Sequence, residues 1–229
     1  LDRLLEHLGL DELQAEQQAR RDRGDVTQIG IGFSTYNEMC GLAPSRILGA
    51  IRYAAGGWEA ATIRCLPTGT FQVVTGTSPH GQGHETAWSQ ITADLLGVHP
   101  DDVEVLHGDT AVSQNGLDTY GSRSLSVGGV ALWHAGQKIV EKSRQIVAHR
   151  FEVSADDLEQ ANGTFTVKGS PDKTMTVREA ALHAWTAHDL PDGMEPGMEE
   201  TAAYDPPNFS WPGGAHAAVV EVDIETGDA

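Results

Sequence analysis

Apolar positions along the chain recur with two spacings, one typical of helices and one typical of strands. A spacing of three to four residues predicts helices over residues 1–23, 86–96, 127–151 and 176–185. In the first segment the apolar stripe is made of Leu1, Leu4, Leu5, Leu8, Leu10 and Leu13. Gly97 follows the second helix as a natural stop, and the fourth opens with a capping box, Thr176-x-x-Glu179.

Shorter runs rich in β-branched and aromatic residues predict strands between these helices. They cover residues 28–39, 59–66, 71–76, 103–106, 164–167 and 215–223. Turns are expected at residues 42–45 and 67–70, and the polar segments 109–126 and 189–210 are expected to be loops. Strands alternating with glycine turns and helices predict an α+β or α/β layered domain rather than a bundle or a sandwich.

Charge and composition exclude several classes of protein. The net charge is −18 and the pI is about 4.7, which argues against a nucleic-acid surface or docking on an anionic membrane. No run of 18 apolar residues is present, so no membrane span is expected. Two cysteines without a C-x-x-C pair form no disulfide framework, and they favour a reducing, cytoplasmic setting. The first residue falls within a helical pattern and the last follows a strand-like run, so we expect a piece of a longer polypeptide.

The segment after strand 71–76 is the strongest candidate for chemistry. Gly81, Gln82 and Gly83 stand at a strand-to-helix junction in residues 77–83, which we call the glycine bend. The two glycines allow a ligand to approach the backbone closely, and the following helix offers unpaired N–H groups with a positive dipole end. The bend therefore predicts an anion site, with a phosphate as the expected ligand, and the Gln82 amide can bind an oxo group or a heterocycle edge.

The residues of the glycine bend argue against three other kinds of site. A Walker loop fails because Gln82 and Gly83 occupy the Lys and Ser/Thr positions. The glycines between His80 and His84 argue against a zinc pair on a helix. No nucleophile elbow of the G-x-S-x-G type is present. A turn without any ligand remains the alternative for this segment taken alone.

A second junction repeats the same logic. Residues 119–124, which we call the hydroxyl bend, combine small and hydroxyl residues with Arg123 before the longest predicted helix. Arg123 can bind a phosphate or an oxyanion bidentately. The alternative is a helix cap by Ser124 or Ser126 beside a surface arginine. Two such junctions in one domain favour one extended ligand over two coincidences.

Five motifs in order carry a resemblance to a known family. They are GTSPHGQGHET at 76–86, DVEVLHGDT at 102–110, TYGSRS at 119–124, IGFSTY at 31–36 and VEVD at 220–223. The chain resembles the molybdenum-binding large subunit of the xanthine oxidase superfamily, in the carbon monoxide dehydrogenase branch. The resemblance implies that residues 28–229 are a partial molybdopterin-binding domain, preceded by an amphipathic helical lead-in at 1–27.

The resemblance also implies a site. Gln82 is expected near the oxo face of the molybdenum as the catalytic residue, and the cofactor is expected to contact Gly81, Gln82, Gly83, Gly121, Ser122, Arg123 and Ser124. The implied cofactor is molybdenum with molybdopterin cytosine dinucleotide, held without a metal ligand from this chain. Family members hydroxylate carbon monoxide, an aldehyde or a heterocycle with oxygen from water. They pass electrons to iron–sulfur and FAD-containing partner subunits, so an oligomer is expected.

Several points stay open. The family's catalytic glutamate has no match here, since Glu38, Glu85 and Glu104 do not correspond to it, and the piece alone is not expected to turn over substrate. Arg123 contacts the dinucleotide phosphates or is a surface charge. Tyr120, His80 and His84 pack behind the site or serve the core and helix ends. Two further functions remain: a non-catalytic domain that binds a phosphate ligand, and an acidic scaffold.

Overall fold

The computed structural model describes residues 1–41, 44–113 and 115–229, and its contacts divide the chain into two units. One unit joins residues 1–39 to 211–229, and the other contains residues 40–210. The turn expected at 42–45 falls partly on Leu42 and Ala43, which lie outside the described residues. The prediction of a lead-in at 1–27 before a domain at 28–229 stays a prediction.

The smaller unit is a two-stranded sheet with two helices. β1 (Thr27–Asn37) pairs antiparallel with β9 (Gly213–Asp223) along its whole length. Both strands were predicted, although their pairing was not. The single helix expected at 1–23 is wrong in one respect: it is split into α1 (Asp2–Leu8) and α2 (Leu10–Arg23). Gly9 between them adopts a left-handed conformation with φ of 63°, which ends the first helix.

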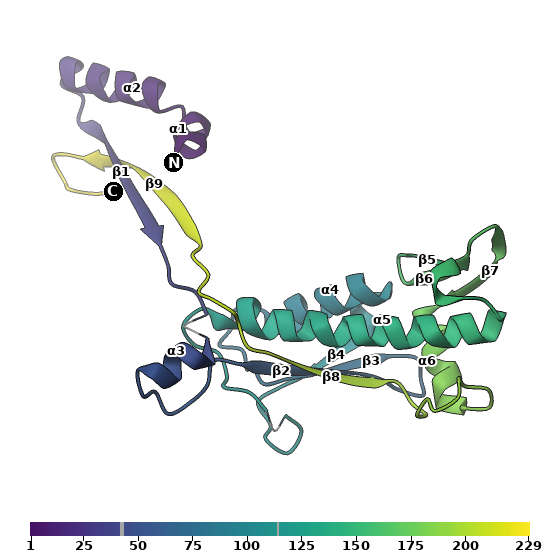
Figure 1. Cartoon of the computed structure of the whole chain (residues 1–229). Helices are drawn as coiled ribbons and strands as arrows, with labels where there is room; N and C mark the ends of the chain where they lie inside the picture. The colour runs from purple at the N-terminus through teal and green to yellow at the C-terminus, as the bar shows by residue number, and fades with distance from the viewer. Residues whose placement is uncertain (42–43, 114) are drawn as a thin grey trace. The chain divides into compact units, whose positions relative to one another are not determined.

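A four-stranded sheet forms the centre of the larger unit, in the order β4-β3-β2-β8 (Figure 1). Its strands are β2 (Glu59–Cys65), β3 (Phe71–Thr75), β4 (Val103–Leu106) and β8 (Glu199–Tyr204). The predicted turn at 67–70 joins β2 and β3 as an antiparallel hairpin. β3 and β4 are parallel, and the crossover between them contains α4 (His84–Leu96), which ends at left-handed Gly97 as predicted.

Two helices bury the apolar residues of this sheet. α5 (Val130–Phe151) lies along β2 and β8 and contacts α4 (Figure 1). Ile63 and Val73 of the sheet are fully buried together with Ile139 of α5. The alternate residues of β2 carry polar pairs instead, with Arg64 bound to Glu199 and Thr62 to Thr201. This period-two pattern places the core on one face and a polar surface on the other.

Two of the expected helix starts, at residues 86 and 127, were late by two to three residues. α4 begins at His84 rather than at residue 86, so the glycine bend leads directly into it. The helix expected from residue 127 is preceded by a π-helical segment, Ser124–Gly129, that is continuous with α5. The hydroxyl bend therefore also opens directly into a helix.

The remaining elements surround this sheet. α3 (Ser45–Ala50) precedes β2, and the short 3-10 helices Pro100–Asp102 and Ala155–Asp157 precede β4 and β5. A second sheet contains β5 (Leu158–Ala161), β6 (Thr164–Val167) and β7 (Ser170–Thr176), of which only β6 was predicted. It leads into α6 (Val177–Thr186), where the expected capping box of Thr176 and Glu179 is confirmed.

The loop expected before residue 211 was wrong in part. The segment 189–210 was expected to be a loop, but it contains β8, which pairs with β2. β8 has the sequence EETAAY and buries only Ala202, so it lacks a local strand signal. Its pairing with β2 and its packing against α5 stabilise it, and neither is visible in a local pattern.

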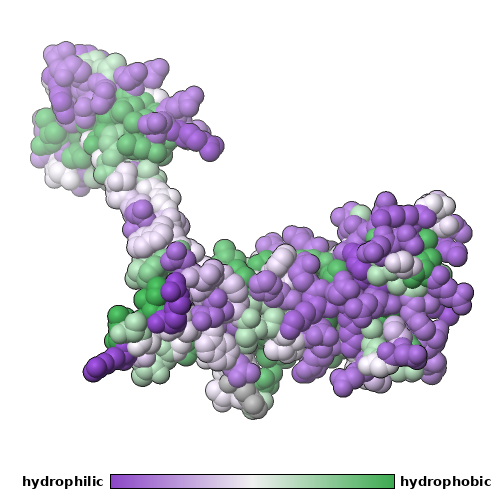
Figure 2. All heavy atoms as spheres, viewed as in Figure 1, coloured by the Kyte–Doolittle hydropathy of each residue, from purple (hydrophilic) through white to green (hydrophobic). Residues whose placement is uncertain are grey.

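Hydrophilic side chains lie at the surface of the larger unit. Figure 2 shows hydrophilic residues over most of the visible face around the C-terminal part of α5. Within the three described ranges, none of the helices combines the length and the apolar composition that crossing a membrane requires.

Candidate functional site

The glycine bend leaves its backbone open at the start of α4. Gly81 and Gly83 have φ values of 95° and 77°, and a Cβ added at either would meet no heavy atom within 4 Å. Glycine is therefore required for the backbone conformation and not for lack of space. Gly83 caps α4 and no side chain caps this helix, but the Glu85 carboxylate accepts a hydrogen bond from its own N–H, so the other first-turn N–H groups are those that an anion can bind.

Gln82 has a fixed orientation within the bend. Its side-chain Oε1 accepts a hydrogen bond from the backbone N–H of His80. Because the oxygen is bound inside the bend, the Nε2 amide remains as the donor that Gln82 can offer to a ligand. The residue is exposed, as are Gly81 and Gly83.

The hydroxyl bend has an equally unusual backbone. Gly121 and Ser122 both have positive φ values, 56° and 55°, and Ser122 tolerates this conformation without being glycine. The Gly41 N–H donates to the carbonyl oxygen of Gly121 at 3.0 Å, and the Cys40 thiol donates to that of Ser122 at 2.8 Å. Two consecutive backbone carbonyls in the middle of the bend are thus held by the segment at residues 40–41.

The alternative of a helix cap by Ser124 or Ser126 is wrong. The π-helical segment starts after Arg123 and has no side-chain cap. The Ser124 hydroxyl instead bonds that of Thr119 at 2.8 Å, across the hydroxyl bend. The Ser126 hydroxyl donates back to the carbonyl oxygen of Ser122 at 3.4 Å. Both serines therefore bind groups of the bend itself.

The two bends contact each other directly. His80 Nε2 lies 2.9 Å from the Thr119 carbonyl oxygen. The Ser78 N–H donates to Asp118 Oδ1 at 3.0 Å. Beside them is a cavity of about 280 Å³ whose lining includes Gly76, Ser78, Gly108, Gly116 and Asp118. The two junctions therefore form one continuous surface.

Asp118 is an anion at the junction of the bends. Burial acts to raise its pKa, but hydrogen bonds from the N–H groups of Thr119 and Ser78 lower the pKa below its usual range. The carboxylate is thus stabilised in its charged form. It orders the backbone where the two bends meet.

Arg123 is not a surface charge, so that alternative is wrong. Its side chain is 1% exposed, and it forms an ion pair with the fully buried Glu59. Its guanidinium also binds three backbone carbonyl oxygens and lies 5.4 Å from the centre of the Tyr120 ring. Contact between Arg123 and cofactor phosphates stays a prediction, although the guanidinium already has these protein partners.

Sequence reasoning missed Glu59. The signal was an acidic residue at the start of β2, whose other residues are mostly buried. A buried carboxylate requires a partner, and the partner is an arginine that was assigned to the surface as one alternative.

Of the three aromatic residues named near the bends, His84 and Tyr120 are packed into the larger unit. His84 is buried, with Nδ1 3.3 Å from the Thr77 carbonyl oxygen and its ring stacked at an angle on Trp88. Burial raises the pKa of the Tyr120 phenol. His80 differs, because it links the two bends.

The glutamates set aside as bases also have local partners. Glu85 Oε1 lies 2.8 Å from His107 Nε2, and hydrogen bonds from its own backbone N–H and from His107 lower the pKa of Glu85. Glu104 accepts a hydrogen bond from Gln72 on the polar face of the sheet.

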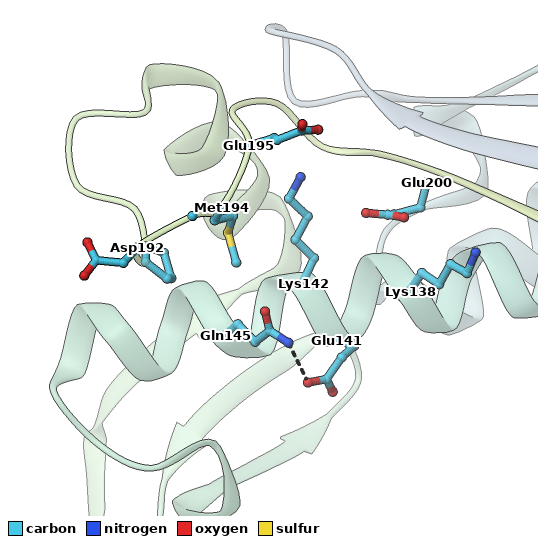
Figure 3. A pocket seen from close by; sticks show the side chains of 10 residues that line it. Lys138, Glu141, Lys142, Gln145, Asp192, Met194, Glu195 and Glu200 are labelled. Atoms are coloured by element: carbon cyan, nitrogen blue, oxygen red, sulfur yellow. Dashed lines mark hydrogen bonds between the residues drawn. The ribbon is translucent and has the colours of Figure 1, made fainter.

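A larger cavity lies away from the bends. It has a volume of about 450 Å³ between α5 and the segment before β8 (Figure 3). Lys142 points into it between Met194 and Glu200, with Glu195 and Lys138 nearby (Figure 3). Its lining mixes both charges, and Lys138 lies roughly two turns from the start of α5.

The residues at the bends fit a large anionic cofactor. The glycine bend offers exposed backbone donors and the Gln82 amide, and the hydroxyl bend offers Ser122 beside it. A Cβ at Gly76 or Gly116 would overlap neighbouring atoms, so the backbones there approach as closely as the fold allows. Among the described residues, no group of three His, Cys, Asp or Glu side chains is placed to hold a metal ion.

Comparison with known proteins decides the family. The model of the molybdopterin cofactor-binding domain matches residues 3–229. The chain belongs to this family. The molybdopterin cofactor-binding domain was expected from the five motifs, and the resemblance is confirmed together with the α+β fold.

Two relatives match all or nearly all of the chain. The chain is 40% identical to the carbon monoxide dehydrogenase large chain of Hydrogenophaga pseudoflava, over all of this chain and 28% of that protein. It is 31% identical to the gamma subunit of the 6-hydroxypseudooxynicotine dehydrogenase complex of Paenarthrobacter nicotinovorans, over 92% of this chain and 25% of the relative.

Solved structures agree with the observed fold. A crystal structure of the Cu,Mo-CO dehydrogenase matches with a TM-score of 0.87 and 38% identity over 98% of the domain and 28% of that chain. Quinoline 2-oxidoreductase from Pseudomonas putida 86 matches with a TM-score of 0.82 and 32% identity, over 99% of the domain and 28% of that chain. The domain therefore spans little more than a quarter of these relatives.

Proposed function

We propose that this domain holds the molybdenum cofactor in the large subunit of a molybdenum hydroxylase. The observation that carries the proposal is the direct contact of His80 in the glycine bend with Thr119 in the hydroxyl bend, beside the hydrogen bond from Ser78 to Asp118, the residue before the hydroxyl bend. A single extended ligand can then span both helix starts. The family match and the 40% identity to a carbon monoxide dehydrogenase large chain support the same conclusion.

Each bend has its own task in binding. The N–H groups at the start of α4 bind an anionic group of the cofactor, and the positive end of the helix dipole strengthens that interaction. Gln82 donates from Nε2 to an oxygen at the reacting centre, because its Oε1 is already bound to His80. Gly121, Ser122 and Ser124 border the remainder of the ligand, which we propose is molybdopterin cytosine dinucleotide.

The cofactor supplies the oxidation–reduction chemistry when bound, and the chain supplies position and electrostatics. A substrate of the carbon monoxide, aldehyde or heterocycle class is hydroxylated with oxygen from water. Electrons leave to iron–sulfur and FAD-containing partner subunits in an oligomeric, cytoplasmic assembly. The base for this reaction comes from outside the 229 residues, so the piece alone is inactive.

A substrate screen of the full-length protein tests this function. The protein is produced with its partner subunits in a host that makes the molybdenum cofactor. Carbon monoxide, small aldehydes and quinoline are then supplied with a dye as electron acceptor. Dye reduction with at least one of them supports the proposal. A folded protein that contains the cofactor but reduces no dye would indicate that the domain has a non-catalytic binding role.

A further inference from the structure

Glu59 and Arg123 form an ion pair in the interior of the larger unit, beneath both bends. Their side chains are 0% and 1% exposed. We propose that this pair is a positioning pair, which fixes the glycine bend and the hydroxyl bend at the spacing that the cofactor requires. The inference rests on the proposed function, because it assigns a task to residues that support the same site.

Arg123 connects the hydroxyl bend to two other segments. Its NH1 donates to Glu59 and to the Asp118 carbonyl oxygen, the latter at 2.8 Å. Its NH2 donates to the carbonyl oxygens of Gly57 and Trp58, at 3.1 and 2.8 Å. The planar guanidinium therefore joins the residues before β2 to the segment that enters the hydroxyl bend.

Glu59 brings the ion pair next to Gly76, the residue before the glycine bend. Its Oε2 accepts a hydrogen bond from the Leu117 N–H at 3.2 Å, and its Oε1 accepts one from the Ala60 N–H at 3.2 Å. A Cβ at Gly76 or Gly116 would overlap Glu59 Oε1. The carboxylate thus lies between the end of β3 and the segment 116–118, and glycine at both positions makes that approach possible.

The pair reaches the cofactor-facing residues through a short series of contacts. Arg123 holds the backbone of Asp118, and the Asp118 carboxylate accepts the Ser78 N–H of the glycine bend. The neighbouring Thr119 carbonyl oxygen is bound by His80, whose own N–H binds Gln82. A shift of the guanidinium therefore displaces both bends and the orientation of the Gln82 amide.

Stability alone does not account for such a pair. Removing two charges from water is costly, and apolar residues of similar volume often hold a fold equally well. An apolar pair would not bind the backbone groups of the two segments 57–60 and 117–118 with fixed directions. The geometry points to positional specificity as the contribution of Glu59 and Arg123.

Isosteric variants of the full-length protein with its partner subunits test the proposal. Glu59→Gln keeps the shape and removes the charge, and Arg123→Lys keeps the charge and removes the planar fork. The matched control is Glu199→Gln, which breaks the exposed pair with Arg64 on the polar face of the sheet. Glu59→Asp serves as a conservative variant, since it restores the charge one methylene short.

Three readouts separate positioning from general folding. They are molybdenum per chain after gel filtration, the Mo(V) electron paramagnetic resonance signal after dithionite reduction, and amide hydrogen exchange over residues 76–83 and 116–124. In Glu59→Gln and Arg123→Lys we expect exchange at both bends to rise at least roughly ten-fold, because removing one partner leaves an unpaired buried charge or donor. Cofactor content falls and the signal changes in what remains.

The outcomes are distinct. Exchange over β5–β7 stays unchanged in every variant, and Glu199→Gln matches the wild type in all three readouts. Wild-type behaviour in Glu59→Gln would overturn the positioning role and leave the proposed function intact. Loss of cooperative folding in Glu59→Gln, Glu59→Asp and Arg123→Lys alike would also overturn it, since the pair would then serve folding. A wild type without molybdenum would refute the proposed function, while the exchange data would still test the pair.

Discussion

His80 Nε2 lies 2.9 Å from the carbonyl oxygen of Thr119, so two bends that are 39 residues apart in the chain share a hydrogen bond. Each bend opens directly into a helix, one into α4 and the other into the π-helical segment before α5. This hydrogen bond joins the starts of the two helices into one surface. We propose that the cofactor binds at that surface.

Replacing Gln82 by Ala removes the one side-chain donor that the glycine bend offers at its centre. We expect turnover in the full-length enzyme to fall at least roughly ten-fold, the effect of losing one hydrogen bond to the reacting centre. Steady-state kinetics with the substrate found in the screen checks this. Gln72→Ala, which removes an amide that binds Glu104 on the polar sheet face, is the control. Equal rates in both variants would refute the assigned role of Gln82.

Gly83→Ala tests whether the backbone of the glycine bend matters for binding. Its φ is 77° and an added Cβ has open space, so the cost is backbone strain of about 1–2 kcal/mol. Gly193→Ala is a matched control with φ of 79° and the same open surroundings. The midpoint temperature of thermal unfolding should fall equally in the two variants. Molybdenum content should fall only in Gly83→Ala, and an equal loss in Gly193→Ala would contradict a specific site.

Asp118 predicts an acid-dependent contribution to stability. Hydrogen bonds from Thr119 and Ser78 lower its folded pKa despite partial burial. A carboxyl with a lowered folded pKa stabilises the protein above its unfolded pKa of about 3.9, and the contribution is lost as the pH falls through the folded value.

The variant that tests this is Asp118→Asn. It should be less stable than the wild type to urea near neutral pH, and the difference should disappear at pH values below the folded pKa. Urea titrations of the full-length protein across this range measure both. A difference that stays constant down to the most acidic pH would show that charge is not the cause.

Cys65 should resist alkylation in the folded protein. Burial raises the pKa of its thiol to about 11, so the reactive thiolate is scarce at pH 8. Iodoacetamide treatment followed by mass spectrometry should leave Cys65 unmodified in buffer and modify it in denaturant. Rapid modification in buffer would mean that β2 opens more readily than its burial suggests.

Local signals in the sequence predicted the parts of the fold that depend on neighbours in the chain. Gly97 ended α4 and Thr176 capped α6 because both effects act within one helical turn. β8 was missed because its pairing with β2 joins residues far apart in sequence. The strand has one buried residue, so its sequence shows no alternation of apolar and polar positions that would predict a strand.

The candidate site shows the same division. Motifs identified Gly81, Gln82 and Gly83, because a glycine turn before a helix is a local feature. Their contact with the hydroxyl bend required the structure. Glu59 was missed since nothing near it in the sequence shows that its partner is Arg123, 64 residues away.

Molybdenum and phosphorus analysis of the purified full-length protein tests the central claim most directly. We expect molybdenum in equimolar amount with the chain, together with the phosphorus of a pterin dinucleotide that is released on denaturation. A folded, assembled protein that contains neither, after expression in a host that makes the cofactor, would contradict it.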